Sequence, residues 1–157
     1  MYQRTMFEIR RDDMTGAQTR ALLALHLAGM QADSPPDAAF ALDLSGLQSP
    51  DILLWSLWDG KNLAGVGALR AIGPDQGEIK SMRTHPDHLR KGVAAALLRH
   101  IIATARAQGM ARLSLETGRG AAFEPALALY RAHGFTDGEA FGDYGANGFS
   151  QFLHLRL

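Results

Sequence analysis

Residues 78–105, EIKSMRTHPDHLRKGVAAALLRHIIATA, decide which fold we predict for this chain. The segment from Glu78 to Arg83 fits a β-strand, and Pro86 ends it because proline forces an extended or turning path. Beyond the turn, apolar residues recur at spacings of three and four, which is typical of a helix with one apolar face: Val93, Leu97, Leu98, Ile101, Ile102 and Ala105. The stretch therefore predicts a strand, a turn and a long amphipathic helix in that order.

Arg90, Lys91 and Gly92 lie where this helix is predicted to begin. A helix start has unpaired backbone N–H groups and a partial positive charge, both of which suit a phosphate group. Glycine lets a ligand approach the backbone closely because it has no Cβ atom. The turn therefore predicts an anion site, with pyrophosphate as the expected anion. Taken alone, the same residues are equally typical of simple helix capping and solvation.

The segment Arg90-Lys91-Gly92-Val93-Ala94 resembles motif A of the GNAT superfamily of acyltransferases, which runs Gln/Arg-x-x-Gly-x-Gly/Ala and binds the pyrophosphate of acetyl-CoA. Gly92 and Ala94 match the two small positions. Leu89 stands where the family usually has Gln or Arg. Much of the anion contact in the family is made by the backbone, and either basic residue of the turn can supply the missing charge.

A later stretch resembles the second signature of the same superfamily. Leu129-Tyr130-Arg131-Ala132-His133-Gly134-Phe135 matches the ending Leu-Tyr-x-x-x-Gly-Phe, whereas Glu124 stands where the family often has Asn. The alternating segment Arg112 to Glu116 predicts a strand between the two signatures. Two signatures in the right order are more specific than either one alone. The wider resemblance covers nearly the whole chain, which looks most like the small bacterial single-domain acetyltransferases of this superfamily.

The predicted elements follow the order β-α-α-β-β-β-α-β-α-β-β, which indicates an α/β fold. The hairpins predicted between residues 52 and 83 argue against a doubly wound sheet, which needs a helix between nearly all strands. The resemblance implies a GNAT-like mixed, mostly antiparallel sheet flanked by about four helices, as one domain over residues 1–157. Besides the segments already given, the predicted elements are strands at Met6–Arg10, 52–58 and 63–72, helices from Thr15 or Gly16 and from Glu124, an ambiguous short helix within 38–47, and a closing segment at 149–157.

Composition fits an ordinary globular protein, with 46% hydrophobic and 20% charged residues among 157. Sixteen basic and sixteen acidic residues balance, which argues against a nucleic-acid partner because such proteins normally carry a basic excess. The sequence has no apolar run of about 18 residues, and its N-terminal stretch is charged where a signal peptide is apolar. We therefore expect no membrane partner and a cytoplasmic location.

Cysteine is absent from the sequence, which excludes both a cysteinyl-enzyme intermediate and a thiolate metal site. Direct attack of the acceptor on the thioester is then the simpler mechanism for an acyltransferase. The six histidines show no helical spacing of four that would suit a metal, so we expect no metal site.

The resemblance implies that Tyr130, near the coenzyme sulfur, protonates the departing thiolate as a general acid. It also implies a carboxylate base near Glu78, at the start of the strand that carries the coenzyme, for an ammonium acceptor. Glu116, on the neighbouring strand, is a rival base, and His85 is a weaker third candidate. The alternatives without a catalytic role are that Tyr130 packs its ring in the core and that Glu78 is merely solvated.

Acetyl-CoA is the implied cosubstrate. Strand residues before the turn are expected to bind its pantetheine arm through backbone hydrogen bonds and to offer an N–H group to the thioester oxygen. Together with the turn, the expected coenzyme-binding set is Met82, Arg83, Thr84, Leu89, Arg90, Lys91, Gly92, Val93 and Ala94.

The acceptor is expected to be a primary amine of a small molecule or of a protein. Its groove is expected in the region 22–40, where the family varies, with His26, Met30 and Phe40 as candidate lining residues. The family contains both monomers and dimers, so a homodimer is compatible with the resemblance. Two alternatives stay open: a catalytically silent acyl-CoA-binding sensor or interaction module on the same fold, and a phosphate-binding protein of another kind. The Walker motif of P-loop NTPases is absent.

Overall fold

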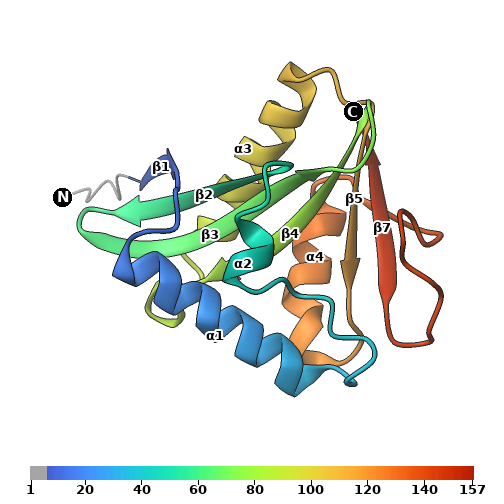
Figure 1. Cartoon of the computed structure of the whole chain (residues 1–157), viewed down its shortest axis with the longest axis horizontal. Helices are drawn as coiled ribbons and strands as arrows, with labels where there is room; N and C mark the ends of the chain where they lie inside the picture. The colour runs from blue at the N-terminus through green and yellow to red at the C-terminus, as the bar shows by residue number, and fades with distance from the viewer. Residues whose placement is uncertain (1–6) are drawn as a thin grey trace.

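The computed structural model describes residues 7–157 and contains one sheet flanked by helices (Figure 1). Its seven strands follow the order β1-β2-β3-β4-β5-β7-β6. All neighbours pair antiparallel except β4 and β5, which pair parallel. The predicted mixed, mostly antiparallel fold is therefore confirmed. The strands are β1 Phe7–Arg11, β2 Ile52–Asp59, β3 Asn62–Ala71, β4 Gln76–Thr84, β5 Arg112–Thr117, β6 Thr136–Gly138 and β7 Gln151–Arg156.

Helices cover both faces of the sheet, and Figure 1 shows α1 and α2 in front of it and α3 behind. Leu22 of α1 and Leu47 of α2 share one buried cluster with strands β2 and β3. Leu97 of α3 and Leu127 of α4 belong to a second cluster that includes the other side of the same strands. The helical elements are α1 Ala17–Asp33, α2 Leu44–Leu47, α3 Val93–Ala107, α4 Glu124–Ala132 and the short 3₁₀ turns Pro86–His88 and Ala121–Phe123.

Helix α3 follows the predicted periodicity. The six apolar residues that recur through it are all buried against the sheet, so the apolar face predicted from their spacing is confirmed. Gly92 precedes the helix with a φ of 80°, and Gly109 follows it with a φ of 79°. Both conformations are left-handed, which glycine adopts without steric cost.

Strands β4 and β5 separate after a short stretch of pairing, as Figure 1 shows. Their register runs only from Gln76 opposite Arg112 to Glu78 opposite Ser114, although β4 continues to Thr84. A β-bulge lies in the same half of β4, where Ser81 adopts a φ of 55°. The second half of β4 therefore has an edge that β5 does not pair, and a space opens between the two strands.

The order of helices and strands is as predicted, and the differences lie at their ends. Helix α1 begins at Ala17, one or two residues later than expected. In the ambiguous segment 38–47 only the last four residues are helical, and the side chain of Asp43 caps that turn by accepting from the Gly46 N–H. The predicted strand start at Met6 lies outside the described residues. Within residues 7–157, no helix has both the length and the apolar character needed to cross a membrane.

Candidate active site

A cavity of about 500 Å³ lies at the opening between β4 and β5. Its walls come from β4, the end of β5, the start of α3, helix α4 with the turn before it, and the C-terminal half of α1. Residues 40, 41 and 144, which lie in loops, complete the lining. The site thus joins residues that are far apart in the sequence, because the parallel pairing of β4 with β5 ends just before the opening.

The start of α3 forms one end of this cavity and has the features of an anion site. Arg90 and Gly92 both adopt left-handed conformations, with φ values of 61° and 80°. The turn from Leu89 to Gly92 is exposed, and the first turn of α3 carries no acidic residue. Alternating backbone conformations next to free helix N–H groups produce a concave, electropositive surface. The turn therefore fits a phosphate or pyrophosphate group.

Eight of the nine expected coenzyme-binding residues line the cavity. The exception is Lys91, which is exposed and is not among the lining residues. Residues from Met82 to Thr84 lie on the half of β4 that β5 does not pair. Their free backbone groups suit an extended ligand that binds as an added strand does. Leu89, where the family has Gln or Arg, is a large hydrophobic residue left exposed beside the turn.

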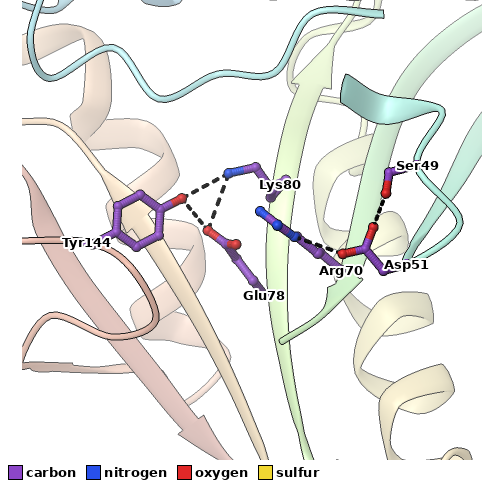
Figure 2. Close-up of polar contacts among 6 residues, drawn as sticks. All are labelled: Ser49, Asp51, Arg70, Glu78, Lys80 and Tyr144. Carbon is purple, nitrogen blue, oxygen red and sulfur yellow. Dashed lines mark hydrogen bonds and ion pairs between the residues drawn. The ribbon is translucent and has the colours of Figure 1, made fainter. Parts of the chain in front are cut away.

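Glu78 forms a buried polar cluster with two residues that the sequence did not single out (Figure 2). Lys80 Nζ lies 3.3 Å from Glu78 Oε2 and donates a hydrogen bond of 2.9 Å to the Tyr144 hydroxyl. The Tyr144 hydroxyl in turn donates to Glu78 Oε2. Glu78 is only 2% exposed. Because both partners contact Oε2, Oε1 is the oxygen left to accept a proton from a ligand in the cavity.

The Glu78 carboxyl thus contacts both a cation, Lys80, and a hydrogen-bond donor, Tyr144. Burial, followed by the charge of Glu78 and its hydrogen bond, raises the pKa of Tyr144. Tyr144 therefore keeps its proton near neutral pH and remains a donor. Lys80 lies two residues after Glu78 on one strand, so strand periodicity alone places the two side chains on one face. Tyr144 lies in the loop before β7, and no sequence signal predicts its contact.

Glu116 also lines the cavity, from the end of β5. Burial raises the pKa of its carboxyl, and the charge of Glu78 acts in the same direction. A hydrogen bond with Ser150 and the charge of Lys80 oppose the shift without cancelling it. Three carboxylates thus line one cavity, those of Asp33, Glu78 and Glu116. Among residues 7–157, Glu78 is the one of the three that has a direct ion pair. Glu78 and Glu116 both remain candidates for the base.

Tyr130 lies on α4 and borders both the core and the cavity. Its side chain is 6% exposed, and its ring lies edge-on to Phe135 with the centroids 5.7 Å apart. Burial alone raises the pKa of its phenol, so the hydroxyl stays protonated and can donate. The ring of Tyr130 thus packs in the core, and the catalytic role of its hydroxyl stays a prediction. His85 does not line the cavity, and its Nδ1 atom accepts from the Asp87 N–H instead.

His26, Met30 and Phe40 line the cavity from α1 and the segment after it, as expected for the acceptor groove. Arg83 Nε donates to His26 Nδ1 at 3.0 Å. Burial, followed by the charges of Arg83 and Lys80, lowers the pKa of His26 to about 4. His26 is therefore neutral at physiological pH, with Nδ1 as the acceptor.

Mild acid should destabilise the protein through His26. Its pKa falls from 6.5 to about 4 on folding, so between these values the unfolded chain binds a proton that the folded chain does not. The neutral, buried His26 contributes its full share to the free energy of unfolding above pH 6.5, and this share is lost as the pH falls toward 4. The loss is about 3 kcal/mol, because one pKa unit corresponds to about 1.4 kcal/mol. Urea unfolding across this range measures it. His26→Asn offers an oxygen in place of Nδ1 but does not titrate, so its stability should fall less steeply. Parallel curves for the two proteins would contradict the assignment.

Comparison with known proteins identifies the family. The model of the acetyltransferase (GNAT) family matches residues 5–135. The chain is 50% identical over 149 residues to the uncharacterized N-acetyltransferase YsnE of Bacillus subtilis (strain 168), covering 95% of this chain and 99% of that protein. It is 47% identical over 152 residues to the uncharacterized N-acetyltransferase YedL of Escherichia coli (strain K12), covering 97% and 96%. The chain belongs to the GNAT acetyltransferase family, as the two sequence signatures predict.

Solved structures agree with this assignment. A protein of Klebsiella pneumoniae named as an acyl-CoA N-acyltransferase superposes with a TM-score of 0.82 at 27% identity, covering 98% of this chain and 99% of that chain. A Bacillus subtilis acetyltransferase solved in complex with CoA superposes with a TM-score of 0.72, covering 97% and 99%. Its identity is 22%, so this second likeness is one of fold alone.

Proposed function

We propose that this chain is an acetyl-CoA-dependent N-acetyltransferase that transfers the acetyl group directly to a primary amine of a small molecule or a protein. The observation that carries the proposal is that one cavity joins the anion-binding turn at α3 to Glu78 and Tyr130. A carboxylate and a protonated phenol are the two groups that the reaction needs, one to remove a proton and one to supply a proton.

The coenzyme would lie along the opening between β4 and β5. The turn from Leu89 to Ala94 suits the pyrophosphate, and the unpaired edge of β4 suits the pantetheine arm. A backbone N–H group on that edge would donate to the thioester oxygen, where negative charge develops during transfer. A Bacillus subtilis acetyltransferase with the same fold was solved in complex with CoA, which supports a CoA thioester as the ligand.

In the proposed reaction, Glu78 first removes a proton from the ammonium group of the acceptor, directly or through water. The neutral amine nitrogen attacks the thioester carbonyl carbon, and the new N–C bond forms as the C–S bond breaks. Tyr130 gives its proton to the departing sulfur. The proton lost by the amide nitrogen restores Tyr130 through solvent, and Glu78 releases its proton to solvent. The products are therefore an N-acetyl amine, the free CoA thiol and one proton.

A thermal-shift series with acyl-CoAs, followed by an amine screen that detects free CoA thiol, tests this function. Acetyl-CoA should raise the apparent stability by about 2.7 kcal/mol at a hundredfold excess over its dissociation constant. Acetyl-CoA binding without thiol release from any amine would identify the silent acyl-CoA-binding module instead. Absence of acyl-CoA binding would reject both and favour another phosphate ligand.

Gly92→Val should weaken acetyl-CoA binding by about tenfold or more, which corresponds to about 1.4 kcal/mol. Valine at a φ of 80° is strained, and its branches would enter the open space where the pyrophosphate is expected. Gly109→Val is the matched control, because Gly109 has a φ of 79°, open space around it, and a place at the opposite end of α3. Calorimetry on folded proteins measures both. Equal affinities in the two variants would remove the turn from the coenzyme site.

A further inference from the structure

Arg83 brings a positive charge to the cavity without a contacting carboxylate. It is partly buried, and its Nε and Nη2 atoms donate to Nδ1 and the carbonyl oxygen of His26, at 3.0 and 3.4 Å. Both acceptors are neutral, since His26 carries no charge near neutral pH. Across residues 7–157, no ion pair includes Arg83.

The other charges around the cavity do not neutralise this guanidinium by contact. Burial lowers the pKa of Arg83, and only the charge of Asp33 acts against that effect. Asp33 is exposed at the end of α1 and forms no ion pair with Arg83 in the described chain. Glu78 is already paired with Lys80. A partly buried charge is costly unless it is paired, so the geometry leaves a place for an anion from outside the protein.

His26 fixes the direction of this group. His26 accepts one hydrogen bond from Nε and one from Nη2 of Arg83, whose side chain lines the cavity. Among residues 7–157, no hydrogen bond uses Nη1 or the remaining hydrogen of Nη2. A planar guanidinium that has hydrogens left on both Nη1 and Nη2 suits a carboxylate, which it can bind through two parallel hydrogen bonds. The contact with α1 holds Arg83 on the acceptor side, whereas the anion turn for the coenzyme lies at the start of α3.

Met30 and Phe40 form an apolar wall in the cavity that Arg83 and the candidate base Glu78 also line. Met30 lies one helical turn after His26 on α1 and also lines the cavity. Phe40 continues this wall and lies edge-on to Tyr144, with the ring centroids 5.1 Å apart. Tyr144 in turn contacts Glu78. The same cavity therefore offers a cation, an apolar surface and a carboxylate.

We propose that the acceptor is an amino acid with an apolar side chain, whose carboxylate binds Arg83 while its amine faces Glu78. This inference rests on the proposed function and names the substrate class for the same site. Arg83 determines specificity, and His26 positions it. The apolar side chain of the acceptor lies against Met30 and Phe40.

The test compares L-methionine, L-leucine and L-phenylalanine with their carboxamides, which keep the amine and side chain but lose the carboxylate charge. Calorimetry on the CoA-loaded protein measures binding without turnover, and steady-state kinetics with acetyl-CoA measures transfer. The wild type should prefer at least one of these amino acids to its amide by about ten- to hundredfold, the range expected for hydrogen bonds to a charged group. Arg83→Met should abolish that preference and leave amide binding unchanged. The coenzyme contact expected of residue 83 is made by the backbone, which methionine keeps, so acetyl-CoA affinity should stay within about twofold.

Each contrary outcome has a separate meaning. Equal binding of acids and amides by the wild type overturns the inference without any variant, and so does binding of neither. Loss of acetyl-CoA affinity in Arg83→Met also overturns it, because Arg83 would then bind a coenzyme phosphate. Arg83-dependent binding of the amino acids without any thiol release supports the ligand class and rejects the proposed transfer reaction.

Discussion

Glu78→Gln is expected to lower turnover by about 10²–10⁴-fold, the usual contribution of a positioned general base. An alkyl ammonium has a pKa near that of lysine, about 10.4, so the reactive neutral amine is scarce near neutral pH. Without the base, the reaction depends on amine that solvent has already deprotonated. The pH–rate profile should therefore move upward, while acetyl-CoA affinity stays nearly unchanged.

Glutamine is a suitable replacement because its amide oxygen can still accept from Lys80 and Tyr144. It removes the negative charge beside buried Lys80, so unfolding must be measured together with the kinetics. Two variants serve as controls. Tyr144→Phe removes one hydrogen bond to Glu78 but keeps the carboxylate, and should cost less activity. Glu116→Gln tests the rival base directly. An unaltered pH–rate profile in Glu78→Gln, with a shift in Glu116→Gln, would transfer the role to Glu116.

Local patterns in the sequence are sufficient to predict the strand and helix around the anion turn. Helix α3 buries an apolar face that repeats every three to four residues, so its spacing is visible without knowledge of what it packs against. Segment 38–47 has no such pattern. Most of it is neither helix nor strand, and its short helix depends on the Asp43 cap, so propensity alone overstates its extent.

The polar contacts of the site are less predictable, because they join distant parts of the chain. Tyr144 and Glu78 are 66 residues apart, and Arg83 and His26 are 57 apart. Family signatures indicate Glu78 and Tyr130 because these residues lie on or beside the signatures themselves. Tyr144, which contacts Glu78, lies in a loop, and His26, which contacts Arg83, lies on α1, so both contacts depend on the folded chain. Residue chemistry thus predicts the reaction class, whereas the acceptor that we propose depends on tertiary contacts.

Tyr130→Phe is expected to lower kcat by about 10²-fold, the lower end of the range for general acid–base catalysis, because the coenzyme thiol is a fairly good leaving group. Phenylalanine keeps the ring that packs against Phe135, so the fold and its stability should stay close to those of the wild type. The loss should fall on kcat more than on KM, since the proton is needed only as the C–S bond breaks. Steady-state kinetics with one working acceptor measures it, and single-turnover rates establish that chemistry limits kcat. Tyr144→Phe removes a hydroxyl from the same cavity and controls for a general effect of polarity. If Tyr130→Phe kept the kcat of the wild type with chemistry limiting, the tyrosine would be a core residue that borders the cavity, and solvent would protonate the thiolate.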